Sequence, residues 1–341
     1  AIGAEKQSEG FPLPFVGPTA EMKIAAKDRA FWSFRPVKKM ALPAVKNLAW
    51  ASTPIDQFLL AGLEKAGLSP APPATRPELI RRVYLDLIGL PPAPEAIHAF
   101  VVDESPDAYE KLIAQLLDDP RYGERWGQHW LDVVRYAETE GFEYDRSLPD
   151  GWRYRDYVIA AFNADKPYDQ FVLEQLAGDE IAPENREMQV AASFHRLGPI
   201  RRNAGNQDVT SSRNEILTER TDIIGAAFLG LTIGCARCHD HKYDPIRQKD
   251  YYQMQAFVAA TQERDIPVAT EKEQAAWKAR TQAIDDEIKK LREALRGAEG
   301  EQARELREKL KEAESRLAEP PAAIASIWNV DADRTPVHVL K

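Results

Sequence analysis

Both cysteines of the chain lie in one short segment, Gly234-Cys235-Ala236-Arg237-Cys238-His239. Cys-x-x-Cys-His is the attachment pattern of c-type haem. Two thiols about one helical turn apart can add to the two vinyl groups of one porphyrin, and the next residue can ligate the iron. The pattern therefore predicts covalent haem c, with Cys235 and Cys238 as the thioether anchors and His239 as the proximal ligand.

Two other kinds of site fit the same residues less well. A redox disulfide of the thioredoxin type usually opens a helix after a strand in a βαβ unit, and no such pattern precedes Cys235. A zinc ion bound by Cys235, Cys238, His239 and His241 would be cramped, because structural zinc normally takes two separated pairs of ligands. A zinc- or disulfide-stabilised binding module without haem is therefore kept as an alternative.

The sixth ligand of the iron has to come from elsewhere in the chain. In the helix expected over 122–138, His129 shares a face with Trp126 and Trp130, and the two indoles would supply an apolar wall beside a haem. We rank His129 first as cofactor and metal ligand, then Met254 of the helix expected over 251–260, then an empty distal position.

Two other histidines are weaker candidates for this position. His241 lies two residues after His239 and would stay on the proximal side of the porphyrin. His195 follows Phe194 at the edge of a long polar stretch, where we expect a more exposed setting. Neither is therefore expected to ligate the iron.

Two polar segments could contact a haem or a substrate. The stretch 196–220 has too few apolar residues for core, and its arginines could pair with haem propionates, although solvated surface arginines are the simpler interpretation. The loop 138–146 mixes carboxylates with aromatic rings. It fits either a solvated loop or a site for a polyhydroxylated ligand or a cation, but its spacing matches no calcium loop.

Several stretches of the chain resemble one known family. They read WSFRPV at 32–37, RWGQHWLD at 125–132, WRYRDYV at 152–158, LTERTDIIGAAFLGLT at 217–232 and CARCHDHKYDPI at 235–246. Together they resemble the planctomycete cytochrome-type domain of unknown function, the PSCyt2 type (DUF1549), over roughly residues 30–262. The resemblance implies a haem c domain but no particular reaction. It also implies that a second family domain, of the PSD1 type, begins near the end of this chain.

Composition limits the partners and the location. The formal net charge of −9 disfavours nucleic acid, which requires a basic face, and suits a basic redox partner or an adjoining domain. The longest uncharged run, 223–236, is too short for a transmembrane segment. Haem c is attached outside the bacterial cytoplasmic membrane, so we expect a periplasmic or otherwise extracytoplasmic protein whose export segment was removed before Ala1.

The elements that must position these residues are mostly α-helical. Capping signals at Thr53, Thr75 and Ser105 start three amphipathic helices in succession. We expect an extended N-terminal arm over 1–52, an irregular helical cytochrome c-type domain over 53–265, an antiparallel coiled-coil hairpin over 272–318 with a turn at Gly297 and Gly300, and the truncated start of a following domain over 320–341.

The sequence therefore predicts an extracytoplasmic c-type haem protein that transfers electrons within a larger multidomain redox protein or complex. The alternative with chemistry of its own is a haem-dependent oxidoreductase with an open distal position and a polar substrate such as a carbohydrate. Iron coordination separates the two, because two protein ligands favour electron transfer and an open position leaves room for a substrate.

Overall fold

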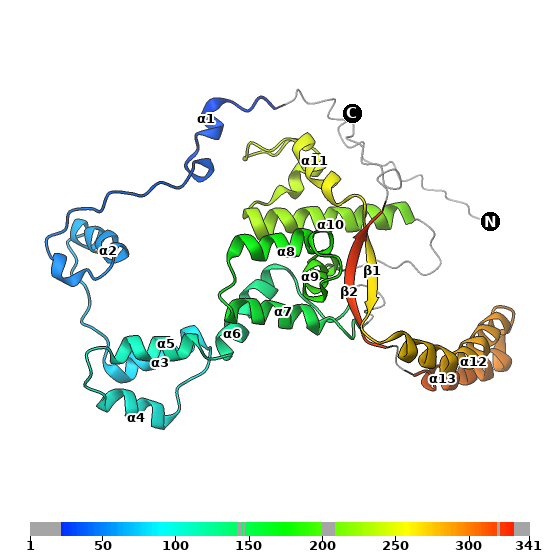
Figure 1. Ribbon diagram of the computed structural model, residues 1–341. Helices are drawn as coiled ribbons and strands as arrows, with labels where there is room; N and C mark the ends of the chain where they lie inside the picture. Colours follow the sequence, from blue (N-terminus) through cyan, green and yellow to red (C-terminus); the bar gives the residue numbers. More distant parts are fainter. Residues whose placement is uncertain (1–21, 142–144, 146, 200–208, 319–320, 331–341) are drawn as a thin grey trace, which may run out of the picture. The chain divides into compact units, whose positions relative to one another are not determined.

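The computed structural model describes residues 22–141, 145, 147–199, 209–318 and 321–330 (Figure 1). Helices dominate this part of the chain, and its strands are β1 (Thr261–Pro267) and β2 (Ala323–Asn329), so the prediction of a mostly α fold is confirmed. None of the described helices is long and apolar enough to cross a membrane. The described part of the chain divides into two compact units, one formed by residues 22–119 with 235–252 and the other by 120–234 with 253–330.

The first unit contains short helical turns followed by longer helices. Its elements are α1 (Ala26–Arg29), η1 (Trp32–Phe34), η2 (Leu48–Trp50), α2 (Pro54–Lys65), α3 (Arg76–Leu87), α4 (Pro94–Val102) and α5 (Ala108–Leu117). Helices α3, α4 and α5 enclose a small apolar core, made of Ile80, Val83, Tyr84, Ile88, Phe100, Ala108, Leu112 and Leu116. Arg76 fastens α3 to the end of α4, because its guanidinium donates to the carbonyls of Phe100 at 2.9 Å and Asp103 at 2.8 Å.

Helices α2 and α3 begin at the predicted capping boxes. Thr53 Oγ1 accepts a hydrogen bond from the Asp56 N–H at 3.3 Å, and the Asp56 carboxylate accepts one from the Thr53 N–H at 2.8 Å. The Glu78 carboxylate accepts in the same way from the Thr75 N–H at 2.9 Å. These contacts satisfy N–H groups that have no partner within the helix at its start.

The third predicted helix start is wrong in detail. Helix α5 begins at Ala108, whereas Ser105 donates through Oγ to the Asp103 carboxylate at 2.6 Å and through its N–H to the same oxygen at 2.9 Å. The serine therefore stabilises the turn before the helix rather than capping it, which is the competing use of a short polar side chain. Helix α4, which starts at Pro94, was not predicted.

The second unit packs helices around an aromatic core. The helices around this core are α6 (Arg121–Val133), α7 (Trp152–Asn163), α8 (Tyr168–Ile181), α9 (Arg186–Ala191), η3 (Ala192–Arg196) and α10 (Val209–Leu229). The buried core residues are Val134, Tyr154, Tyr157, Val158, Ala161, Phe171, Ala191, Phe194 and Ile223. Helices α6 and α7 approach closely at Gly123 of α6. Because glycine has no Cβ, the Ile159 carbonyl of α7 can lie where a Cβ would otherwise clash with it.

The prediction that the polar stretch 196–220 stays outside the core is wrong for the part that forms helix α10. From residue 209 on the chain is helical, and Leu217, Arg220 and Thr221 are buried. The prediction assumed that arginines lie at the surface. Arg220 is instead buried, and its guanidinium donates hydrogen bonds to backbone carbonyls. Residues 200–208 of that stretch lie outside the described part of the chain.

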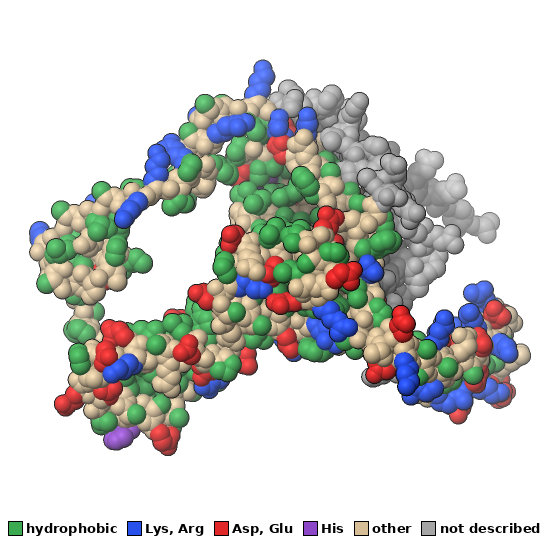
Figure 2. Space-filling view, viewed as in Figure 1, with side chains coloured by type: hydrophobic (Ala, Val, Ile, Leu, Met, Phe, Trp, Pro, Cys, Tyr) green, Lys and Arg blue, Asp and Glu red, His purple; other side chains and the backbone are tan. Residues whose placement is uncertain are grey.

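A helical hairpin is inserted between the two strands of the second unit. Strands β1 and β2 pair antiparallel, from Thr261 opposite Asn329 to Pro267 opposite Ala323. Between them, α12 (Glu271–Leu295) and α13 (Gly300–Ser315) form the expected antiparallel pair. The seam buries Ile288, Ala303 and Ala313, while Lys, Arg, Asp and Glu side chains cover the outside of the hairpin (Figure 2).

Strand β2 belongs to the second unit and not to a separate body. The Ser193 hydroxyl donates to the Ala325 carbonyl at 2.5 Å, and the Ser326 hydroxyl donates to Gln189 Oε1 at 2.6 Å. The β character expected after residue 320 is therefore present at 323–329, but these residues complete the body that precedes the hairpin. Residues 331–341 lie outside the described part of the chain.

Candidate functional site

The two cysteines lie on and just after a short helical turn, η4 (Ile233–Arg237). Both are free thiols with exposed side chains, whereas Ala236 between them is fully buried. Ala236 therefore packs into the protein, while the side chains of both cysteines are exposed to solvent. Within the described residues, no three His, Cys, Asp or Glu side chains form a group that could hold a metal ion, so the four ligands of the zinc alternative are not assembled.

His239 has the proton arrangement that a metal ligand needs. Its exposed ring has Nδ1 2.7 Å from the carbonyl oxygen of Asp240. A carbonyl only accepts hydrogen bonds, so Nδ1 carries the proton and the lone pair of the neutral ring lies on Nε2. Histidines that bind metals usually donate their other N–H to a carbonyl or carboxylate in this way.

The segment is attached to the start of α11 (Gln248–Val258). The Asp240 carboxylate accepts hydrogen bonds from the Gln248 N–H at 2.8 Å and the Met22 N–H at 2.6 Å. The carbonyl of Arg237 accepts from the Gln248 side-chain amide and the Tyr252 hydroxyl, both at 3.1 Å. Burial raises the pKa of Tyr252, so this hydroxyl keeps its proton at neutral pH. The backbone between the two cysteines is therefore fixed by side chains of α11.

His241 is buried and serves the loop. Its N–H donates to the Ile246 carbonyl at 2.8 Å, and its Nδ1 accepts from the Asp244 N–H at 2.9 Å. A carboxylate oxygen of Asp244 also lies 3.3 Å from Nδ1 and would favour a proton there. A proton on Nδ1 would point at the Asp244 N–H, which donates to the same nitrogen, and two donors cannot share one hydrogen bond. We therefore place the proton of the neutral ring on Nε2. In this arrangement the ring has no free lone pair for a metal.

His129 has a different environment from the one expected. It is exposed on α6, and its ring meets the Trp126 indole edge to face, with ring centroids 5.5 Å apart. Trp130 turns into the core, where its Nε1 donates to the Tyr154 hydroxyl and to Gln175 Oε1, both at 3.1 Å. The expected wall of two indoles around His129 is therefore wrong. His129 and the cysteine segment belong to different units, and ligation by His129 stays a prediction.

The other two candidates for the sixth ligand differ in burial. Met254 is half-buried on α11, and its ligation of iron also stays a prediction. His195 is buried and not exposed as expected, and its Nε2 donates to the Leu176 carbonyl at 3.2 Å. Burial, and then the nearby charge of Arg220, lower the pKa of His195 to about 4, so the ring is neutral at pH 7. His195 is a core residue.

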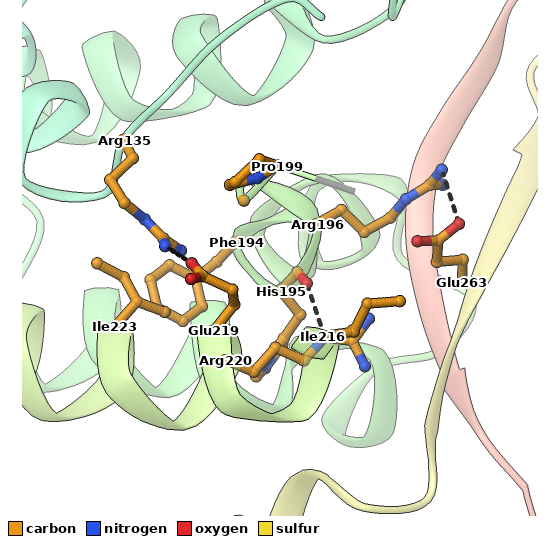
Figure 3. Close-up of a pocket in the computed structure, with 11 residues that line it drawn as sticks. Arg135, Phe194, His195, Arg196, Pro199, Ile216, Glu219, Arg220, Ile223 and Glu263 are labelled. Carbon is orange, nitrogen blue, oxygen red and sulfur yellow. Dashed lines mark hydrogen bonds and ion pairs between the residues drawn. The ribbon is translucent and has the colours of Figure 1, made fainter. Parts of the chain in front are cut away.

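Two arginines of the stretch 196–220, Arg213 and Arg220, bind the protein instead of remaining available for propionates, and Figure 3 shows Arg220 against His195. Arg220 donates to the carbonyls of His195 at 2.8 Å and Thr261 at 2.7 Å. Arg213 donates to the carbonyls of Ala259 and Thr261, both at 2.7 Å. Burial, reinforced by the charge of Arg213, lowers the pKa of Arg220 to about 10, still far above neutrality. These arginines therefore join α10 to β1 and η3.

The described part of the loop 138–146 shows no gathered cation site. Glu138 accepts hydrogen bonds from the Tyr136 hydroxyl at 2.7 Å and from Arg155 at 3.0 Å. Thr139 and Ser147 form a β-bridge that closes the loop, and Glu140 is buried. Residues 142–144 and 146 lie outside the described part of the chain. The carboxylate of Glu138 therefore has a structural use.

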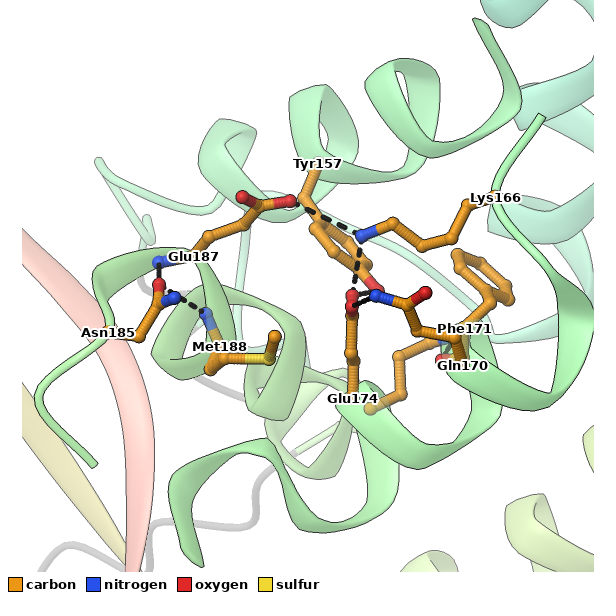
Figure 4. Close-up of polar contacts among 9 residues, drawn as sticks. Tyr157, Lys166, Gln170, Phe171, Glu174, Asn185, Glu187 and Met188 are labelled. Carbon is orange, nitrogen blue, oxygen red and sulfur yellow. Dashed lines mark hydrogen bonds and ion pairs between the residues drawn. The ribbon is translucent and has the colours of Figure 1, made fainter. Parts of the chain in front are cut away.

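One buried polar cluster was not found from the sequence (Figure 4). Glu174 of α8 accepts hydrogen bonds from Lys166 Nζ at 2.5 Å, the Tyr157 hydroxyl at 2.8 Å and the Gln170 amide at 2.8 Å. Burial acts to raise the pKa of Glu174, but these hydrogen bonds outweigh it and leave the pKa below its ordinary value. The available sequence signal was the pair Gln170 and Glu174 at helical spacing beside the buried Phe171.

Fold and segment together define a mostly α protein with a Cys-x-x-Cys-His sequence displayed on a short helical turn. The model of the PSCyt2 family, described as a protein of unknown function (DUF1549), matches residues 54–263, and the chain belongs to this family. The match begins at the first residue of α2 and ends within β1. The PSD1-type domain expected near the end of the chain is not among the matches and stays a prediction. No curated protein and no solved structure matches the chain.

Proposed function

We propose that this chain is a c-type haem protein that works outside the cytoplasm, in the periplasm or an equivalent compartment, and transfers electrons within a larger multidomain redox protein or complex. Cys235 and Cys238 hold the haem through thioether bonds, and His239 is its proximal ligand. Bound haem supplies reversible one-electron transfer at its iron. The net charge of −9 suits a basic redox partner, because opposite charge speeds docking.

The contact between His239 Nδ1 and the Asp240 carbonyl oxygen is the observation that carries this proposal. The Nδ1–H of His239 donates to the Asp240 carbonyl at 2.7 Å, which leaves Nε2 unprotonated in an exposed ring directly after the two thiols. Asp240 is itself held by the backbone of Gln248, so the imidazole is oriented before any ligand arrives. The chain thus positions the lone pair, and no proton has to leave the neutral ring on ligation.

Accessibility of the thiols supports the same proposal. Thioether formation requires that both sulfur atoms reach the edge of a porphyrin, and Cys235 and Cys238 are free and exposed. The buried Ala236 and the hydrogen bonds to the Arg237 carbonyl keep the backbone between them in place. The turn can therefore accept a large planar group without unfolding the residues around it.

For the sixth ligand we keep His129 first, Met254 second and an empty position third. His129 is accessible on α6, and Met254 lies on the helix that anchors the cysteine segment. His195 and His241 are both buried, and one ring nitrogen of each already has a hydrogen bond within the protein. The two accessible candidates are therefore the ones to test.

The decisive experiment measures covalent haem. The chain should be produced with an export signal in a bacterium that carries a c-haem attachment system, then denatured and weighed by mass spectrometry. We expect the mass to include one haem, and the variant Cys235→Ala with Cys238→Ala to lack it. His98→Gln, which changes an exposed histidine of α4, is the matched control and should keep the haem. Exported protein with two free thiols and no haem would overturn the proposal.

The spin state of the iron separates electron transfer from catalysis. A low-spin iron that becomes high-spin in His129→Ala identifies His129 as the sixth ligand, and the same change in Met254→Leu identifies Met254. Electron paramagnetic resonance and visible absorption spectra report this change. A high-spin iron in the unmodified chain would favour the alternative, a haem-dependent oxidoreductase with a polar substrate, because its distal position would be open.

A further inference from the structure

The second unit contains a hollow of about 240 Å³ where α7 ends and α8 begins. Most of its lining is aromatic: the residues are Tyr122, Trp130, Ala161, Phe162, Asp165, Lys166, Tyr168 and Phe171. Phe171 meets both Phe162 and Trp130 edge to face, with centroids 6.2 and 5.1 Å away. The rings therefore face the hollow at different angles and form a shaped apolar wall.

One polar side chain of this hollow is fixed before any ligand binds. Lys166 Nζ lies 2.5 Å from Glu174 Oε2 and 3.3 Å from Glu187 Oε1, and 4.7 Å from the centre of the Tyr157 ring (Figure 4). Its side chain is only 13% exposed. Two carboxylates leave one ammonium proton for a further acceptor. Because the side chain is already ordered, little conformational entropy is lost when that proton meets a ligand.

The neighbouring carboxylate occupies an unusual backbone position. Asp165 has a φ of +47°, just after the end of α7, and the next N–H, that of Lys166, closes the turn on the Ala161 carbonyl at 3.0 Å. Glycine is the usual residue at such a position because it has no steric cost there. An aspartate at this place is exposed and lines the hollow, as does Lys166. The hollow thus combines one acceptor and one donor at adjacent positions.

The charges decide which class of ligand fits. Glu174 and Glu187 neutralise Lys166, and Asp165 adds a negative charge, so an anion is disfavoured. A purely apolar ligand would desolvate both polar groups without replacing their hydrogen bonds. A neutral ring with many hydroxyls avoids both costs. Its C–H faces pack on aromatic rings, while its hydroxyls donate to Asp165 and accept from Lys166. A cation is the rival class of ligand, and binding of D-glucosamine distinguishes it.

We propose that this hollow binds one neutral sugar residue. Tyr168, which is 59% exposed, forms the outer rim and packs against the ring, and Asp165 and Lys166 bind its hydroxyls. The volume of about 240 Å³ is below the range of roughly 300–1,000 Å³ typical of pockets for drug-sized ligands, which suits a single ring. The site is built by the second unit alone and does not depend on haem.

The test uses the full chain without haem and ligand-detected NMR. The probes are D-glucose, D-galactose, D-mannose, D-xylose and L-fucose, with D-glucuronate and D-glucosamine as charged counterparts. We expect at least one neutral sugar to bind and both charged sugars to bind more weakly. Asp165→Asn and Tyr168→Ala should each weaken that binding roughly tenfold, the size expected for one charged hydrogen bond or one ring contact.

The controls separate binding from folding. Asp165 and Tyr168 are exposed, and asparagine also tolerates a positive φ, so both variants should melt at the temperature of the unmodified chain. Tyr243→Ala removes an exposed tyrosine of the first unit and should not change the affinity. The proposal is overturned if no neutral sugar binds, if a charged sugar binds more tightly, or if neither variant weakens the binding.

Discussion

The cysteine segment and the arginine cluster around β1 place polar side chains in opposite environments. In the segment, the side chains of Cys235, Cys238 and His239 are exposed and are not packed in the core. In the cluster, Arg220 and His195 are buried, and the hydrogen bonds of Arg220 join secondary structure elements. The exposed groups of the segment are held in place through their backbone, whereas Arg220 is held by its own side-chain hydrogen bonds. We therefore expect substitutions in the arginine cluster to lower the free energy of unfolding strongly, and substitutions of the exposed cysteines to change it little.

The largest effect is expected from Arg220→Met. The substitution removes two charged hydrogen bonds and leaves the buried carbonyls of His195 and Thr261 without their donor. We expect the free energy of unfolding to fall by about 3 kcal/mol. Urea denaturation followed by circular dichroism measures it, and Arg81→Met, an exposed arginine of α3, is the control. A loss below about 1 kcal/mol would contradict the structural role of this arginine.

The next effect is a dependence of stability on pH that comes from His195. Its pKa is lowered from 6.5 to about 4 in the folded chain, so the unfolded chain binds more protons between these values. Its contribution is therefore complete above pH 6.5 and is lost as the pH falls toward 4, by at most about 3 kcal/mol. His195→Phe should flatten the dependence of the unfolding free energy on pH between pH 7 and pH 5. An unchanged slope in His195→Phe would mean that other groups cause it.

The polar contacts of the helical hairpin join its own two helices, as in the ion pairs Arg292–Glu314 and Arg316–Glu287, and removal of the hairpin should cost less. Replacing 272–318 by a short Gly-Asn linker joins β1 directly to β2, whose pairing already extends to the Val268 N–H on the Ala322 carbonyl at 2.8 Å. Because the seam between α12 and α13 is self-contained, we expect the unfolding free energy of the remaining chain to change by no more than about 1 kcal/mol. Loss of a cooperative transition would instead show that the hairpin stabilises the rest.

The sequence predicted the features whose signals are local. The helix starts at Thr53 and Thr75 and the two helices of the hairpin depend on residues a few positions apart, and the structure contains them. It did not predict the burial of Arg220 or the Glu174 cluster, because these depend on carbonyls and ammonium groups supplied by other elements. Exposure of His129 was missed for the same reason: helical spacing defines a face, but packing of Trp130 decides which side of that face enters the core.

The smallest effect is expected at the cysteines themselves. Both thiols are exposed and free, so in the chain without haem the variant Cys235→Ser with Cys238→Ser should keep its unfolding free energy within about 0.5 kcal/mol. Ala236 lies between them in the same turn but is fully buried, and Ala236→Leu should cost about 1–3 kcal/mol through overpacking. Urea denaturation of both variants under reducing conditions measures the contrast. A loss above about 1 kcal/mol in the double serine variant would give the thiols a structural role, and the distinction between exposed reactive groups and buried fold-holding groups would then fail in this segment.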